Sequence, residues 1–121
     1  MKFVYTPTYL KAIKRHRFTK KELEGLESDI EKNPLAGDVI PGLQGYRKIR
    51  FAARGKGKRG GGGSVYYYLV RDDEVFMMTA YPKSQKEDLT KADQRSLLDF
   101  LDALDALEKD KDDGDEEDQE R

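Results

Sequence analysis

The chain has 121 residues, enough for one small domain with a modest hydrophobic core. It contains no cysteine, which excludes disulfides, thiolate metal sites and a cysteine nucleophile. The N-terminal stretch 1–17 lacks the apolar run of a secretory signal, and the longest run without a charge, 60–70, is too short to span a membrane. We therefore expect a cytoplasmic protein without a membrane partner.

Charge is distributed very unevenly along the chain, although the net charge is only −1. The first part, 1–59, holds 15 basic and 6 acidic residues, a net charge of +9. The middle part, 60–92, has a net charge of −1, and the last part, 93–121, has a net charge of −9. Such asymmetry indicates a nucleic-acid-binding surface followed by an acidic tail.

The N-terminal part predicts a short strand and two helices. The strand covers residues 2–5, with Phe3 and Tyr5 on one face and Val4 on the other. Thr6 is a suitable cap for the first helix, and Pro7 suits its first turn because proline lacks the N–H that would stay unpaired there. Thr19 and Glu22 have the spacing of a capping box for the second helix, which ends at an Asn-Pro pair. The two helices are expected to form a hairpin.

The centre of the chain predicts three antiparallel strands and a final helix. The strands cover residues 46–53, 65–70 and 74–81, and a flexible glycine-rich connection, 54–63, joins the first two. A tight turn joins the second and third. Thr90 is expected to cap the last helix, which has a stripe of leucines at helical spacing.

These elements predict an α+β fold in a single small domain, residues 1–107. An N-terminal strand and a helical hairpin would pack on a mostly antiparallel sheet of about four strands, with a C-terminal helix. The remaining residues, 108–121, are almost all charged, so we expect a disordered acidic tail.

The most basic stretch begins at the first central strand. Seven basic residues and no acidic residue lie between Tyr46 and Arg59, and a run of glycines and three tyrosines follow. Basic residues beside aromatic ones are typical of surfaces that bind a phosphate backbone and its bases. Residues 55–60 match the dinucleotide pattern G-x-G-x-x-G, but a strand follows instead of the helix whose N-terminus would hold the pyrophosphate. We therefore reject a dinucleotide site.

Metal and triad chemistry have no support in the sequence. His16 is the only histidine, lies between two arginines, and is expected at the surface. Because no second histidine and no cysteine are present, we predict no metal site, no Ser-His-Asp site and no cofactor. The tyrosines at 66–68 are ambiguous, since alternation buries one face of a strand and leaves the other for stacking on bases.

Four segments in the same order resemble the RelE/ParE superfamily of toxins from bacterial type II toxin–antitoxin systems, most closely its HigB-like branch. The segments are NPLAGDVIPGLQGYRKIRFA (33–52), GKGKRGG (55–61), VYYY (65–68) and AYPKSQKEDLT (80–90). The resemblance implies a RelE-like fold with a concave basic sheet face. Some relatives have a functional tyrosine or histidine near the end of the site, where this chain has Thr90, with Tyr81 nearby.

The resemblance also guides the choice of site residues, and the catalytic candidates are expected on one rim of the sheet. The catalytic candidates are basic residues from three segments: Arg50, Lys56, Lys58, Lys83 and Lys86. The candidates for RNA binding are Arg47, Lys48, Arg54, Arg59, Tyr66, Tyr68 and Tyr81. Lysine and arginine can move protons and stabilise phosphate charge without histidine or metal.

The predicted function is that of a toxin that cleaves mRNA on the ribosome and thereby inhibits translation. Its expected partners are ribosome-bound mRNA and a cognate antitoxin, expected to be a helix-turn-helix protein from a neighbouring gene. Two alternatives stay open on the sequence: a ParE-like toxin directed at DNA gyrase, and a nucleic-acid-binding module without enzymatic activity.

Overall fold

The computed structural model describes residues 1–85 and 89–120, with side chains through Lys109. The chain divides into two compact units, Met1–Glu87 and Asp88–Arg121. The predicted division into a domain of residues 1–107 and a tail of residues 108–121 stays a prediction. Among the described residues, no helix combines the length and apolar character needed to cross a membrane.

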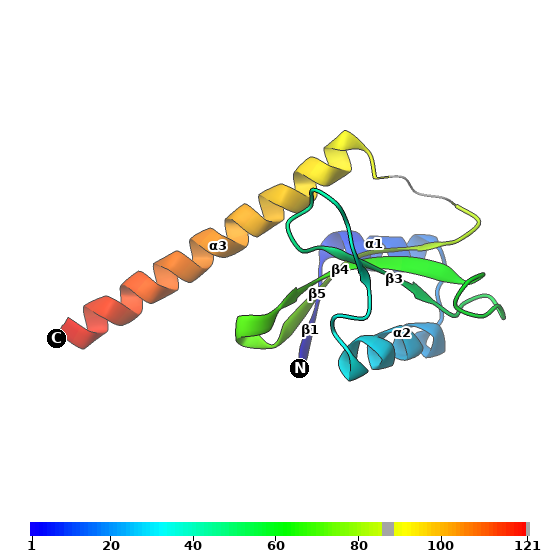
Figure 1. Cartoon of the computed structure of the whole chain (residues 1–121), viewed down its shortest axis with the longest axis horizontal. Coiled ribbons are helices and arrows are strands. Elements are labelled where there is room, and N and C mark those ends of the chain that lie inside the picture. The colour runs from blue at the N-terminus through cyan, green and yellow to red at the C-terminus, as the bar shows by residue number, and fades with distance from the viewer. Residues whose placement is uncertain (86–88, 121) are drawn as a thin grey trace. The chain divides into compact units, whose positions relative to one another are not determined.

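The first unit contains a five-stranded mixed sheet and two helices, in an α+β arrangement that confirms the predicted fold class (Figure 1). The elements are β1 (Lys2–Tyr5), α1 (Pro7–Arg15), α2 (Lys20–Lys32), β2 (Asp38–Val39), β3 (Arg47–Phe51), β4 (Gly62–Leu69), a 3-10 helix η1 (Val70–Asp72) and β5 (Glu74–Pro82). The strand order is β1-β5-β4-β3-β2. Only β1 and β5 are parallel, and the other neighbours are antiparallel.

Both predicted helix starts are confirmed. The side chain of Thr6 accepts a hydrogen bond from the amide of Tyr9 at 3.2 Å, and Pro7 occupies the first turn of α1. Thr19 and Glu22 form the complete capping box of α2, in which each side chain bonds the backbone of the other residue. These caps fix where the hairpin helices begin, and so how their apolar sides meet the sheet.

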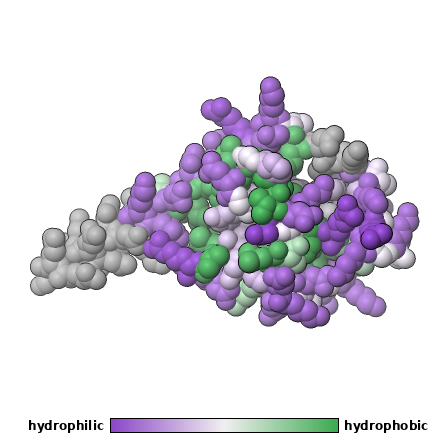
Figure 2. Space-filling view, viewed as in Figure 1, coloured by the Kyte–Doolittle hydropathy of each residue, from purple (hydrophilic) through white to green (hydrophobic). Residues whose placement is uncertain are grey.

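The hydrophobic core lies between the two helices and one face of the sheet. Tyr9 of α1 and Leu26 and Ile30 of α2 pack against strand residues that include Phe51 and Met77. Each of these side chains is at most 1 % exposed. The helices therefore cover one face, and we call the opposite face of the sheet the second face. At the surface shown in Figure 2, hydrophobic residues lie in patches between hydrophilic ones.

The sequence predicted a sheet of about four strands and missed the edge strand β2. The two residues of β2 pair with β3, and they come from a loop rich in glycine and proline, so no period-2 pattern could mark them. The strand β4 begins at Gly62, three residues before its predicted start. Glycine is unfavourable in strands, which is why the sequence predicted a flexible connection there.

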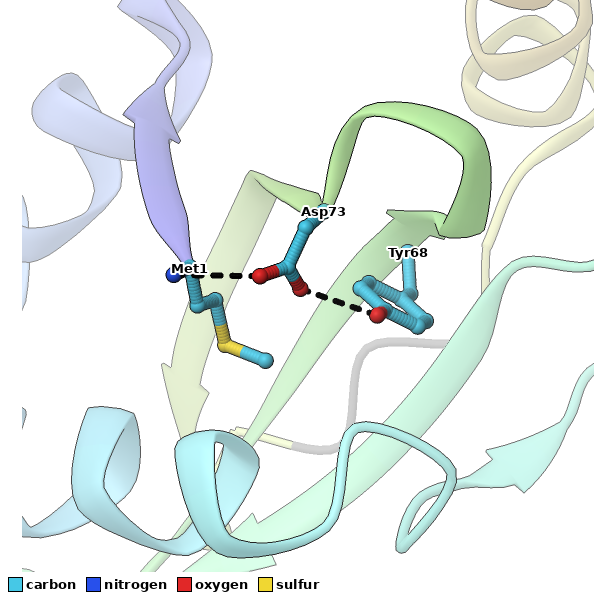
Figure 3. A network of polar contacts seen from close by, with 3 residues as sticks. All are labelled: Met1, Tyr68 and Asp73. Carbon is cyan, nitrogen blue, oxygen red and sulfur yellow. Dashed lines mark hydrogen bonds and ion pairs between the residues drawn. The ribbon is translucent and has the colours of Figure 1, made fainter.

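A small polar network closes the connection between β4 and β5 (Figure 3). Asp73 follows η1 with a φ of +50°. One of its carboxylate oxygens accepts a hydrogen bond from the Tyr68 hydroxyl at 2.9 Å, and the other pairs with the amino group of Met1 at 3.1 Å. The hydrogen bond from Tyr68 and the nearby amino group hold the pKa of Asp73 below its usual value. The network ties β1 to the end of the β4–β5 hairpin.

The second unit consists of α3 (Lys91–Glu120). Thr90 caps it as predicted: its side chain accepts a hydrogen bond from the amide of Asp93 at 3.1 Å, and the Asp93 carboxylate accepts one from the Thr90 amide at 3.0 Å. The helix continues to Glu120, whereas the sequence predicted disorder from residue 108.

Candidate nucleic-acid interface

Two exposed cations of β3 lie on the second face. Along this strand, Ile49 and Phe51 point into the core, so Lys48 and Arg50 point the opposite way. Both cationic side chains are exposed. The sequence alternation predicted this division, and the neighbouring strand β4 supports it, because Lys48 pairs with Val65 and Arg50 with Gly63.

An aromatic ring lies beside these cations because a glycine makes room for it. Gly63 stands between Arg50 on β3 and Tyr81 on β5 in one cross-strand row. A Cβ at Gly63 would lie 2.7 Å from the Tyr81 hydroxyl oxygen, so the phenol end of the ring covers this backbone position. The ammonium of Lys48 is 5.4 Å from the ring centroid, within cation–π range. Lys48, Arg50 and Tyr81 are therefore neighbours on the second face.

The glycines before this point are needed for close packing. A Cβ at Gly61 would lie 2.3 Å from the carbonyl oxygen of Phe51 and 2.4 Å from the amide nitrogen of Ala53. A Cβ at Gly62 would lie 2.8 Å from the carbonyl oxygen of Tyr81. These neighbours are backbone atoms and cannot move aside cheaply. The prediction of a flexible connection through residue 63 was wrong, because its last residues are fixed in the sheet.

The preceding residues, 52–61, form a connection that we call the basic loop. Its first turn places Arg54 and Gly55 at φ values of +60° and +70°, and an isolated bridge joins Ala53 to Lys56. Positive φ at both central residues is the requirement of a type I′ turn, which suits the twist of the flanking strands. Lys56 and Arg59 are exposed in the loop.

Arg54 is held by the helical hairpin. Its amide donates a 2.5 Å hydrogen bond to a carboxylate oxygen of Glu22, and its guanidinium donates to the carbonyl of His16. The guanidinium also lies over the ring of Phe18, 4.9 Å from the centroid. These contacts compensate for the left-handed backbone at a non-glycine residue. Arg54, predicted to bind RNA, is thus occupied in anchoring the loop.

The carboxylate of Glu22 serves the helix and the loop at once. One oxygen accepts a hydrogen bond from the Thr19 amide, and the other accepts from the Arg54 amide. Partial burial raises the pKa of Glu22, but the hydrogen bonds from Thr19 and Arg54 outweigh it and the pKa is lowered. His16 was predicted at the surface but is only 7 % exposed, because it packs at the helical turn with its ring 6.2 Å from that of Phe18.

A second carboxylate of α2 pairs with the basic loop. The ammonium of Lys58 is 3.0 Å from a carboxylate oxygen of Asp29. The loop therefore packs against α2, and it does not fold over the second face. Lys56 and Lys58, both predicted catalytic, stand beside this helix, while Arg50 stands on the second face.

Two of the predicted RNA-binding tyrosines face the core side of the sheet. The ring of Tyr66 is fully buried, and its hydroxyl accepts from the Gly37 amide and donates to the Pro34 carbonyl. Tyr68 packs partly against the core and donates to Asp73. The buried ring of Tyr66 is therefore not open to a base, whereas Tyr68 is half-buried. The sequence could assign alternate tyrosines to opposite faces, but not which face the helices cover.

Tyr67, which the sequence analysis did not select, points to the second face. Its ring contacts that of Tyr46 edge-on, with centroids 5.5 Å apart. Arg47, predicted to bind RNA, instead donates to the backbone carbonyls of Leu35 and Gly37, the second at 2.7 Å. Arg47 therefore holds the loop before β3 in place.

The predicted rim is partly assembled at one end of the sheet. Phe51, Gly62 and Pro82 form a cross-strand row there, so the end of β3, the basic loop and the end of β5 meet. Lys83 follows directly, is exposed, and its amide donates to the Gly61 carbonyl at 3.0 Å. Lys86 lies outside the described residues. In the described part of the chain, no group of three or more His, Asp or Glu side chains could hold a metal ion.

Comparison with known proteins gives a limited result. No protein-family model matches the sequence. Among solved structures, the chain is similar to the free state of a double arginine-to-alanine variant of the E. coli toxin RelE. The two share 17 % sequence identity with a TM-score of 0.47, over 67 % of this chain and 81 % of that one. We draw no conclusion from a similarity at this level.

Proposed function

We propose that the chain is the toxin of a type II toxin–antitoxin system and an endoribonuclease that cleaves mRNA on the ribosome without a metal. The observation that supports this best is the cluster on the second face. Lys48 and Arg50 are exposed there, and the ring of Tyr81 lies beside Lys48 at 5.4 Å. The order of the four sequence segments described above supports the same family.

This cluster suits RNA cleavage because RNA contains its own nucleophile. The 2′-oxygen loses its proton and attacks the adjacent phosphorus, the bond to the 5′-oxygen breaks, and the 5′-oxygen takes a proton. The protein must therefore stabilise extra charge on the phosphate and exchange two protons. The planar guanidinium of Arg50 is suited to clamp the phosphate oxygens. Lys48 is the exposed neighbouring group that can exchange protons, and Tyr81, which is 6 % exposed, supports it from beneath through the cation–π contact.

The other predicted catalytic residues keep a part in the proposal. Lys83 follows the strand that carries Tyr81, and Lys56 and Lys58 would contribute charge around the same end of the sheet. Lys86 keeps its predicted catalytic part. We leave Arg54, Arg47, Tyr66 and Tyr68 out of the RNA-contacting set, since their side chains hold the fold together. We add Tyr67 to it, because its ring is on the second face.

The proposed partners are ribosome-bound mRNA and an antitoxin encoded beside the gene, and the proposed location is the cytoplasm. Primer extension on total RNA after brief induction in cells tests the proposal. Cuts linked to codons, absent when Arg50→Ala is induced to the same level, are the expected result. Intact mRNA with inhibited DNA supercoiling would point instead to a gyrase-directed toxin. Intact mRNA and normal supercoiling would favour the remaining alternative, a nucleic-acid-binding module without enzymatic activity.

A further inference from the structure

A groove of about 460 Å³ separates α2 from the basic loop. On one side it is lined by residues of α2: Lys21, Glu22, Gly25 and Asp29. On the other side it is lined by the end of β3 and the loop: Ala52, Ala53, Gly55, Lys56 and Lys58. Ala52 directly follows β3 and is two residues after Arg50, so the end of one strand joins the groove to the cluster on the second face.

The charges in the groove favour an anion. Three lysines and two carboxylates line it, but both carboxylates already have partners. Glu22 accepts hydrogen bonds from two backbone amides, and Asp29 pairs with Lys58. Among the described residues, Lys21 and Lys56 pair with no carboxylate. Lys21 and Lys56 thus line opposite walls of the groove, where the charge of Glu22 is the one carboxylate charge not paired with a lysine among the described lining residues.

Gly25 is the residue that packing within the chain does not explain. It lies in the interior of α2, where glycine is among the least favourable residues. A Cβ there would have no atom within 4 Å, and its φ is not in the left-handed region. A methyl group would fit the fold and would narrow the groove. A glycine at this position is useful to a ligand that approaches the helix closely.

We propose that this groove binds the phosphodiester backbone of single-stranded RNA, continuing the strand held by Arg50 past Ala52. The inference rests on the proposed function and extends it to a second contact surface. Lys21 and Lys56 contact phosphates directly. Lys58 exchanges its Asp29 partner for a phosphate when RNA binds, since the pair is exposed enough to open, with the Lys58 side chain 64 % exposed.

The test is binding of a labelled single-stranded RNA oligonucleotide to the full chain over a range of salt concentrations. Lys21→Ala should weaken binding at low salt and reduce the slope of log affinity against log salt by about 0.7, the loss of one phosphate contact on a single strand. Lys20→Ala is the matched control. It removes the same charge from the neighbouring residue, which lies outside the groove and is 3.9 Å from Glu24. The control should leave the slope unchanged.

Gly25→Ala and Gly25→Leu separate binding from folding. Both should raise the melting temperature, by roughly 4 °C or more for alanine, because the helix gains a better helix former in open space. Both should also weaken RNA binding, leucine more than alanine, because the side chain fills the groove. Stabilised variants that bind RNA as tightly as the original chain would overturn the groove proposal.

Arg50→Ala in the same assay distinguishes the two proposals. If it weakens binding while the Lys21 and Gly25 variants do not, the groove is refuted and the proposed site stands. If the Lys21 and Gly25 variants weaken binding and Arg50→Ala does not, the groove stands and holds RNA independently of Arg50, whose part in cleavage is measured by the cleavage rate. A full chain that binds no RNA at low salt would overturn the groove proposal, whereas the proposed function is overturned only by intact ribosome-bound mRNA.

Discussion

The two ends of β4 are connected in different ways. The connection to β5 has the sequence Val-Arg-Asp-Asp-Glu over residues 70–74, and its carboxylate Asp73 is satisfied by Tyr68 and the amino group of Met1. The connection from β3, the basic loop, has four cations and no acid of its own. Its carboxylate partners, Glu22 and Asp29, come from α2 instead.

This difference separates a structural turn from a surface that presents charge. In the connection between β4 and β5, the Asp73 carboxylate bonds the Tyr68 hydroxyl and the amino group of Met1. This network holds the hairpin and β1 together. In the connection from β3, two carboxylates anchor the basic loop through Arg54 and Lys58 and leave Lys56 and Arg59 exposed. Anchoring a basic loop at two points fixes where its other cations stand, which is what a phosphate-binding surface requires.

The largest effect on stability is expected where β4 begins. Gly61→Ala should lower the free energy of unfolding by about 3 kcal/mol, because the new methyl group would overlap backbone atoms of β3. Gly57→Ala is the control in the same loop, since a Cβ there meets no atom within 4 Å. Urea denaturation measures both. Equal stability of the two variants would mean that the start of β4 is not held as the structure shows.

A smaller loss is expected from the anchor on α2. Glu22→Gln should lower the free energy of unfolding by about 1 kcal/mol, the usual loss for a helix cap, because an amide has only one oxygen for two backbone donors. Glu31→Gln removes the same charge from an exposed position on α2 and should change stability little. Urea denaturation measures both variants. If Glu22→Gln and Glu31→Gln unfolded at the same urea concentration, Glu22 would not be holding both the helix and the loop.

The carboxylate of Asp73, between β4 and β5, should make the stability of the protein depend on pH. The pKa of Asp73 is lowered from 3.8 by the Tyr68 hydrogen bond and the amino group of Met1. Its ionised form therefore stabilises the fold above about pH 3.8, and this contribution is lost as the pH falls through the lower folded-state pKa. Asp73→Asn should flatten the fall in melting temperature below pH 4, whereas Asp72→Asn should not. An unchanged acid limb in Asp73→Asn would show that the network contributes nothing.

The smallest effect is expected from the acidic end of the chain. Residues 108–121 are almost all charged and offer little apolar surface for packing. A chain that ends at Leu107 should melt within a few degrees of the full chain, a difference equivalent to roughly 1 kcal/mol or less. Thermal melting by circular dichroism checks this. A larger drop would mean that the tail takes part in folding.

Sequence patterns predicted the elements whose signals are local. Thr6 and Pro7, the capping box at Thr19, and the alternation that puts Lys48 and Arg50 on one side of β3 were all confirmed. Each follows from a few neighbouring residues. The strand pair of β1 with β5 was not predicted as parallel, because its partners are far apart in the chain and no local pattern encodes their direction.

What the sequence could not give depends on contacts between distant segments. Nothing near Gly63 in the sequence reveals that the ring of Tyr81 would lie on it. The partners of the basic loop, Glu22 and Asp29, precede it by about thirty positions. The charge of the loop was therefore predicted correctly, but its direction, toward α2 and away from the second face, was not.

The central claim is that Arg50 acts on the phosphate, whereas the connection between β4 and β5, residues 70–74, takes no part in cleavage. The most direct test is single-turnover cleavage of ribosome-bound mRNA at saturating protein, comparing Arg50→Ala with Arg71→Ala at the opposite end of β4. We predict that Arg50→Ala stays slower by about 100-fold at saturation, since a defect in charge stabilisation persists when a binding defect vanishes, and that Arg71→Ala cleaves normally. Cleavage by Arg50→Ala at the rate of the unchanged chain would contradict the account.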